Sequence, residues 1–338
     1  MKQQTTKMGI LTYVSIATML VAILAATTMP AMAATDGSST GSFDLGSAAP
    51  TVTGIELYEA DHNATASTLT PTTEFAVKIT AGDSNTIADI DAITVVIKAQ
   101  GYSGTTTDVS YNATYQWTPT SGWALIGPTD TQWTCESGSS EPDNLVAMSG
   151  DWYVNFKLSE AATSEPNWDI TVTADDGEST GTNSKTGIPM DFYAEISAVD
   201  TSYSFGAVAL GASGLPIISD DHDIDVNVTA NGNFKLYSKS DATWIGNGTG
   251  TVATVNPGGL ESGEIQLCDG KNATFGDGGR VQVEGGNGYY WIEDFGNEEG
   301  PTAEVGENRG IYQWLSVAYT GLLPDEYQGT YYVQILNV

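Results

Sequence analysis

The feature that most constrains the fold is a period-two alternation of apolar and polar residues after residue 50. It is clearest in three segments, 74–80, 151–158 and 168–174. Successive side chains of a β-strand point to opposite faces, so this pattern predicts strands with one buried face. Gly, Asp, Asn and Pro separate the segments, and none after the N-terminal apolar run keeps a helical period of 3.6. The sequence therefore predicts an all-β protein built of antiparallel β-sandwiches.

The predicted strands fall into two groups, with a boundary close to residues 189–193. We therefore predict two tandem sandwiches with Greek-key connections, at 51–193 and 194–338, which suits a chain of this length. Residues 34–50 are rich in Ser, Gly and Ala around one apolar island, Phe43-Asp44-Leu45, and are expected to form a flexible leader. In the second group we expect strands at 202–209, 222–230, 234–240, 264–268, 280–284, 289–293, 311–319 and 330–337.

One pair of neighbouring strands allows a register to be predicted. The apolar residues of 224–230 share one face, and so do those of 234–238. A two-residue turn would place Lys235 opposite Val228, inside the apolar layer, whereas a three-residue loop pairs Val228 with Leu236. A slip of one residue reverses every side chain, so burial favours a hairpin with the second register.

The first 33 residues indicate a cleavable export signal. Lys2 and Lys7 precede an uncharged apolar run from Met8 to Ala26, and Ala31-Met32-Ala33 is a small-x-small site for signal peptidase. A retained membrane anchor is the alternative, because a run of about nineteen residues is long enough to span a bilayer. The Ser/Gly-rich stretch that follows favours cleavage. No second apolar span follows, so we expect an extracellular or cell-surface protein with no membrane span in the mature chain.

The charge excludes one class of partner. The chain has 42 acidic and 11 basic residues, with a formal net charge of −31. A nucleic-acid backbone needs a basic footprint, so nucleic acid is excluded as a natural partner. So acidic a surface repels itself unless salt screens it or cations neutralise it. We therefore expect a salty medium, bound divalent cations, or both.

Three groups of carboxylates are candidates for binding Ca²⁺. One lies on a predicted strand face, where the expected hairpin would bring Lys239 to Asp225; the other two lie where strands meet turns. Carboxylate-rich loops of that kind suit Ca²⁺. Solvated acids on a halotolerant surface are the alternative, because no group has the EF-hand spacing. The groups are Asp221, Asp223 and Asp225; Asp83, Asp89 and Asp91; and Asp175, Asp176 and Glu178.

Two further features concern covalent modification. In an exported protein we expect at least two of the Asn-x-Thr sequons to be glycosylated. The two cysteines, Cys135 and Cys268, fall one in each predicted domain, and in an oxidising compartment a disulfide between the domains is one interpretation. A bond to another molecule and two free thiols are the alternatives, because sequence does not place their Cα atoms. The sequons begin at Asn63, Asn112, Asn227, Asn247 and Asn272.

Aromatic residues are abundant, with eight Trp and sixteen Tyr. Trp117, Trp123 and Trp133 are close in sequence and are candidates for a platform on which sugar rings stack; packing inside a sandwich is the alternative. Tyr327 follows Leu323-Pro324 and is expected to donate a hydrogen bond to nearby backbone, in the manner of a tyrosine corner.

Six segments carry turn and strand signatures of a recognisable kind: Asp83–Asp91, Trp168–Gly177, Met190–Ile196, Ser204–Gly206, Val228–Leu236 and Tyr327–Tyr331. They resemble the Ig-like domain and the second β-sandwich of secreted archaeal cell-surface proteins, particularly those of methanogens and their relatives. The resemblance covers most of the chain after the signal. It implies a tandem-sandwich surface protein and raises the expectation that some relatives polymerise into filaments or sheaths. It supplies no catalytic residues.

The sequence gives no reason to expect an enzyme. Its two histidines, His62 and His222, each lie next to an aspartate, and there is no G-x-S-x-G, HExxH, phosphate-binding loop or cysteine cluster with metal spacing. The leading hypothesis is a structural protein that assembles with copies of itself through strand edges, with the leader or the C-terminal strand supplying an edge. The alternative is a secreted adhesin or glycan-binding module that recognises surface polysaccharide.

Overall fold

A computed structural model provides the structure of the chain. The described residues are 41–42, 46, 48–104, 108–128, 132–218, 223–248, 254–257, 259–270, 281–283, 289–291, 302 and 305–337. The predicted signal at 1–33, most of the predicted leader, Asp221, His222 and Asn272 lie outside them. Ser47–Val338 belong to one compact unit. In the part of the chain that is described, no helix has the length and apolar character needed to cross a membrane.

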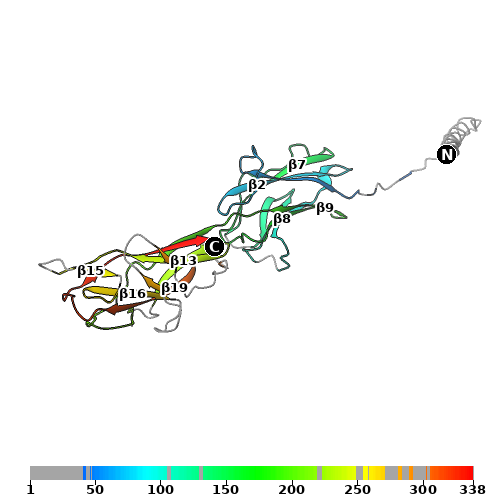
Figure 1. Cartoon of the computed structure of the whole chain (residues 1–338). Coiled ribbons are helices and arrows are strands. Elements are labelled where there is room, and N and C mark those ends of the chain that lie inside the picture. Colours follow the sequence, from blue (N-terminus) through cyan, green and yellow to red (C-terminus); the bar gives the residue numbers. More distant parts are fainter. Residues whose placement is uncertain are drawn as a thin grey trace, which may run out of the picture. The chain divides into compact units, whose positions relative to one another are not determined.

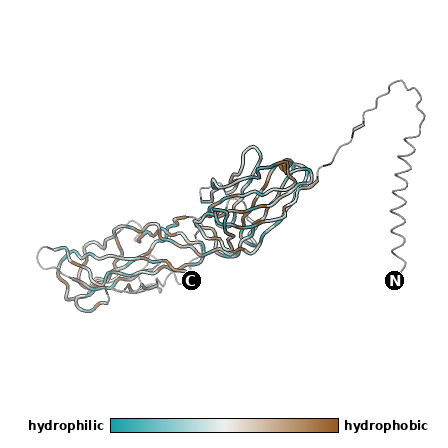
Figure 2. The backbone as a smooth tube through the Cα atoms, turned by 90° about the horizontal axis from the view of Figure 1, so that it is seen from above, coloured by the Kyte–Doolittle hydropathy of each residue, from teal (hydrophilic) through white to brown (hydrophobic). Residues whose placement is uncertain are grey.

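The protein is all-β, which confirms the fold class predicted from the alternation (Figure 1). Strand β8 (Trp168–Asp175) shows the cause, because its alternate residues from Trp168 to Ala174 are buried and those between them are half-buried. Hydrophobic and hydrophilic residues alternate in the same way along other strands (Figure 2). Apart from strands, the described regular structure is one short 3₁₀ turn, η1 (Ile87–Asp89).

Two antiparallel sheets form the first sandwich. One has the order β1-β2-β7-β6 and the other β5-β4-β3-β8-β9. The strands of the first sheet are β1 (Thr51–Glu59), β2 (Glu74–Gly82), β6 (Thr134–Cys135) and β7 (Ser149–Lys157). Those of the second are β3 (Ala92–Ala99), β4 (Asn112–Thr118), β5 (Gly122–Gly127), β8 and β9 (Thr180–Ile188).

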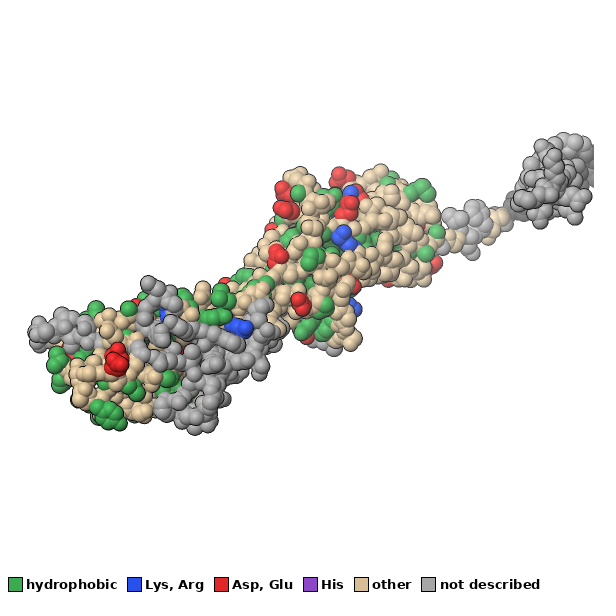
Figure 3. Space-filling model, in the orientation of Figure 1, with side chains coloured by type: hydrophobic (Ala, Val, Ile, Leu, Met, Phe, Trp, Pro, Cys, Tyr) green, Lys and Arg blue, Asp and Glu red, His purple; other side chains and the backbone are tan. Residues whose placement is uncertain are grey.

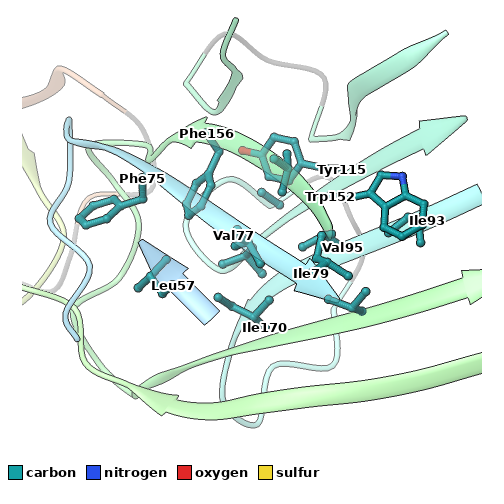
Figure 4. Packing of buried hydrophobic residues seen from close by; sticks show 14 of the residues in the cluster. Leu57, Phe75, Val77, Ile79, Ile93, Val95, Tyr115, Trp152, Phe156 and Ile170 are labelled. Atoms are coloured by element: carbon teal, nitrogen blue, oxygen red, sulfur yellow. The ribbon is translucent and has the colours of Figure 1, made fainter. Parts of the chain in front are cut away.

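The core of the first sandwich lies between these sheets (Figure 4). Phe156 from β7 packs against Tyr115 from β4, with ring centroids 5.9 Å apart. Trp152 meets Trp117 edge to face at 5.6 Å. Aromatic pairs of this kind add to the free energy gained by removing apolar area from water. The facing sheets therefore supply one continuous apolar layer.

The second group of strands begins with β10 and forms two further sheets. One path runs β10-β12-β19-β16-β15-β14-β20, with β11 beside β19 and β17 beside β16; a separate sheet has the order β18-β13-β21. Strand β15 is parallel to β16, whereas the other pairs are antiparallel. The strands are β10 (Ala194–Val199), β11 (Leu215–Pro216), β12 (Asp223–Ala230), β13 (Phe234–Ser240), β14 (Trp244–Gly246), β15 (Thr254–Pro257), β16 (Glu264–Gly270), β17 (Val281–Val283), β18 (Tyr290–Trp291), β19 (Glu307–Val317), β20 (Tyr327–Gln328) and β21 (Tyr331–Asn337).

The predicted hairpin between 224–230 and 234–238 is wrong, although its faces are right. Val228 and Leu236 are both buried, as expected. Strand β12, however, pairs with β10 and β19, while β13 pairs with β18 and β21. The chain crosses from one sheet to the facing sheet between β12 and β13, so both apolar faces reach the same core without pairing. Burial selects a face, but it does not distinguish a hairpin from a crossover.

The crossover centres on Asn231, which is fully buried and hydrogen-bonds residues of both strand groups. Its Nδ2 donates to the carbonyl oxygens of Ala162 and Asp191, each at 2.9 Å. Its Oδ1 accepts from the backbone N–H of Tyr193 at 2.7 Å, and its own carbonyl accepts from Ser164 N at 2.7 Å. Asp191 and Tyr193, which lie between β9 and β10, are thus hydrogen-bonded to the crossover, and the domain boundary at 189–193 stays a prediction.

Candidate functional sites: a sheet edge and a hollow

Strand β21 leaves a regular sheet edge open. It pairs with β13 over its whole length, from Ser240↔Tyr331 to Phe234↔Asn337, with no register shift. Within the described ranges no strand pairs with its other side. Its sequence, Tyr-Tyr-Val-Gln-Ile-Leu-Asn, contains no charge, proline or glycine, and Leu336 is 41% exposed. Such a strand presents a row of backbone N–H and C=O groups to which another chain can add.

The other long edge strands carry features that obstruct strand addition. Strand β1 contains two glutamates and a register shift at Gly54. Strand β9 carries Lys185, and its pairing with β8 also shifts register. Strand β10 carries Glu195 and a shift between Ile196 and Ala198. Strand β5 has a glycine at each end and a shift in its pairing. Charges and bulges discourage edge pairing, so β21 is the edge most open to a partner.

A hollow of about 1070 Å³ opens in the second strand group. Its lining comes mainly from residues 199–208 and 322–331. Trp244, Leu315 and Val317 contribute apolar side chains to its lining. Leu210 and Leu323, which also line it, are 55% and 59% exposed. A concave apolar surface of this size, bordered by exposed apolar side chains, is typical of a binding site.

Asp269 of β16 is a fully buried carboxyl group close to this hollow. Its Oδ2 accepts hydrogen bonds from Ser238 Oγ and from the hydroxyl of Tyr331, which lines the hollow, each at 2.6 Å. Its Oδ1 accepts from Gln313 Nε2 at 2.8 Å. Burial raises the pKa of Asp269 to about 6, and the three hydrogen bonds limit that rise.

Sequence reasoning missed this polar cluster, although a signal was present. Asp269 follows Ile265 and Leu267 at steps of two on β16, so the alternation places it on the inward face. Gln313 has the same relation to Ile311 on β19, and it stands directly opposite Asp269. A charged residue at an inward position is the pattern that identifies a buried polar group.

Of the first predicted Ca²⁺ group, Asp223 and Asp225 lie on β12, whereas Asp221 lies outside the described residues. The carboxylate of Asp223 lies against Gly310 of the neighbouring strand. Asp225 is exposed, and its Oδ1 accepts from Asn308 Nδ2 at 2.8 Å. Lys239 does not face Asp225, because its Nζ lies over the rings of two exposed tyrosines at 4.5 and 4.9 Å from their centroids. The expected Asp225–Lys239 pair is therefore wrong, because β12 and β13 lie in different sheets and do not pair.

The other two carboxylate groups partly meet at one end of the first sandwich. The backbone N–H of Asp91 donates to the carbonyl of Asp175 at 2.8 Å, and the Asp91 carboxylate lies against Gly177. Asp89 is exposed, whereas Asp83 is 4% exposed with its Oδ1 accepting from Asn85 N at 2.7 Å. Asp176 accepts hydrogen bonds from the Glu178 and Ser179 backbone within its own turn. Among the described residues no three His, Cys, Asp or Glu side chains gather as metal ligands, and Ca²⁺ binding stays a prediction.

The sequons differ in accessibility. Asn63 and Asn247 are exposed, and Asn227 is half-buried on the outward face of β12. Asn112 is 3% exposed, and its side-chain amide donates to a backbone carbonyl at 3.1 Å. A glycan needs an accessible side-chain amide, so the folded chain exposes Asn247 and also Asn63, whose Nδ2 donates to Asp61 Oδ2 at 3.0 Å, and it hides Asn112. Their occupancy stays a prediction.

The three tryptophans proposed as a sugar platform do not share an exposed face. Trp117 and Trp133 are each 1% exposed, and their indole N–H groups donate to Glu141 Oε2 and to the Val109 carbonyl, both at 2.7 Å. Trp123 is half-buried. The structure thus supports the packing alternative, because two of the three rings fill the core.

The cysteines, the histidine and the corner tyrosine each have a local structural environment. Cys135 packs at the margin of the first core and Cys268 is buried in β16; no sulfur–sulfur bond joins these two residues. His62 stacks on Tyr153 and places its Nε2 2.7 Å from the Oδ1 of buried Asn155. The hydroxyl of Tyr327 donates to the carbonyl of Leu323 at 2.9 Å, which confirms the predicted corner.

The described residues form an all-β protein of largely antiparallel sheets, with an unpaired edge at β21 and an apolar hollow lined by residues 199–208 and 322–331. On the face in Figure 3, charged side chains are scattered among uncharged ones, and hydrophobic side chains lie at the surface. Neither protein-family models nor curated proteins give a match to this chain.

Proposed function

We propose that this protein is an extracellular structural subunit whose copies join through sheet edges at a cell surface. The observation that carries the proposal is β21, an uncharged and regular edge strand in a chain whose other long edges carry charges and register shifts. The export signal and the resemblance to archaeal tandem-sandwich surface proteins support the location. The net charge of −31 keeps copies apart at low salt, so assembly belongs to a saline or cation-rich medium.

Two lysines introduced into the edge strand test the proposal. Gln334→Lys with Leu336→Lys places like charges where two copies of β21 would meet, and charges on an edge strand oppose pairing. We expect the unaltered protein to form multimers at high salt, seen by electron microscopy and light scattering, and the variant to remain monomeric.

The matched control is Thr186→Lys in β9, an edge strand that already carries Lys185. It adds the same kind of charge at another exposed edge position and is expected to leave assembly unchanged. Circular dichroism establishes that each variant is folded. Unaltered protein that stays monomeric at every salt and Ca²⁺ concentration contradicts the proposed function, and equal assembly of the β21 variant contradicts the role of this edge.

A further inference from the structure

The segment 201–208 has the sequence of a strand but forms no ladder with a described strand. The alternation predicts a strand at 202–209, yet the structure places this stretch in no sheet. Ser204 O accepts from Ile218 N at 2.7 Å, and Gly206 N donates to Ser204 Oγ at 3.0 Å. The other backbone groups of 201–208 make no hydrogen bond to any described residue. Unpaired backbone beside an apolar surface is a place where a strand can be added.

The hollow lies along this same segment. Tyr203 and Phe205 alternate at a strand spacing, pack edge to face at 5.8 Å between ring centroids, and border the hollow. Leu315 and Val317, which are buried, also line it. An occupant that satisfies both features must be extended, must offer backbone hydrogen bonds, and must carry apolar side chains at every second position. A peptide strand meets all three requirements.

A segment of the leader, whose residues 43–45 lie outside the described structure, has that pattern. In Gly41-Ser-Phe-Asp-Leu-Gly46, the apolar Phe43 and Leu45 are two residues apart, so a strand would place both on one face and Asp44 on the other. Residues 34–50 form a stretch of seventeen, which spans roughly 55 Å when fully extended. The leader is therefore long enough to reach a neighbouring molecule.

We propose that the hollow beside residues 201–208 binds the leader of a second copy, whose residues 42–46 add a strand there and insert Phe43 and Leu45. The inference rests on the proposed function: the hollow is the accepting surface and the leader is the donated strand in one contact between copies. It adds a head-to-tail contact to the edge contact at β21, because donor and acceptor are different surfaces. Head-to-tail contacts are those that extend into filaments when they do not close into rings.

The charges on both sides predict how salt affects this contact. Asp200, Asp325 and Glu326 line the hollow, and no described lining residue is Lys or Arg. The leader contains Asp36 and Asp44 and likewise no basic residue. The acidic groups of the hollow and of the leader repel one another, and salt screens this repulsion. The affinity of the hollow for the leader is therefore expected to rise with ionic strength.

A synthetic peptide of residues 37–50 tests the inference, with protein that begins at Ser47 as the acceptor, since Ser47–Val338 is a compact unit. The control peptide carries Phe43→Ser and Leu45→Ser. We expect the native peptide to bind, to slow amide hydrogen exchange in 201–208, and to bind more tightly at high salt. Removal of two buried apolar side chains is expected to weaken binding at least about tenfold.

Two protein variants locate the site. Val208→Arg places charge in the hollow and is expected to abolish peptide binding, whereas Leu260→Arg, at an exposed position outside the hollow, leaves it unchanged.

Peptide binding that slows amide hydrogen exchange at 331–337 instead of 201–208 overturns the inference, as does equal binding of both peptides. If protein that lacks the leader assembles as well as the full-length protein, the inference is also overturned, while the proposed function stands. If the protein assembles neither through the β21 edge nor through the leader, both the inference and the proposed function are contradicted.

Discussion

At the residue scale, Asp269 stands out because a carboxyl group occupies a position where the alternation calls for an apolar side chain. Its neighbours, Ser238, Gln313 and Tyr331, all donate to it. Three donated hydrogen bonds favour the charged form, and complete burial disfavours it; burial prevails, because the pKa is raised to about 6. Burial therefore moves the titration of this carboxyl group to near pH 6.

This raised pKa predicts how stability changes with pH. The folded state holds the proton of Asp269 to higher pH than the unfolded chain does, so the free energy of unfolding falls as pH rises from about 4 to about 6. The loss attributable to this group is about 3 kcal/mol, and it is constant above pH 6. We expect Asp269→Asn to remove that dependence, because an amide does not ionise.

Urea unfolding of both proteins between pH 4 and pH 8 checks this prediction. The difference in unfolding free energy between unaltered protein and variant is expected to change in favour of the variant up to about pH 6 and then to stay flat. Parallel pH profiles for the two proteins would show that Asp269 does not titrate in this range.

At the element scale, the Tyr327 corner ties the loop after β19 to β20. The hydroxyl of Tyr327 donates to the Leu323 carbonyl at 2.9 Å, at an exposed position. Tyr327→Phe removes this bond and keeps the ring, so we expect a loss of at most about 1 kcal/mol in unfolding free energy. Thermal denaturation measures the loss. Tyr319→Phe, at a tyrosine that is 80% exposed, is the matched control and is expected to have no effect; an equal effect of both changes would contradict the corner.

At the scale of the whole molecule, Asn231 couples the two strand groups through hydrogen bonds to both. Asn231→Ala leaves the buried carbonyl oxygen of Ala162, the carbonyl oxygen of Asp191 and the N–H of Tyr193 without this partner. Each buried polar group left unsatisfied costs about 1–3 kcal/mol. We expect the variant to unfold in two calorimetric transitions where the unaltered protein has one.

The control for this change is Asn247→Ala, at an exposed position outside the crossover. It removes a side-chain amide without changing the buried junction, and its calorimetric trace is expected to match that of the unaltered protein. A single transition in both variants would show that the two groups are held together by other contacts.

The sequence by itself determined the all-β class, the inward faces of β8, β12 and β13, and the corner at Tyr327. These follow from local rules, because alternation and turn chemistry depend on residues close together in the chain. Only the tertiary structure decided that β12 pairs with β19 and not with β13, that Trp117 and Trp133 lie in a core, and that Asp91 meets Asp175. Strand pairing joins residues far apart in sequence, and burial, which the sequence does encode, is satisfied equally by a hairpin and by a crossover between facing sheets.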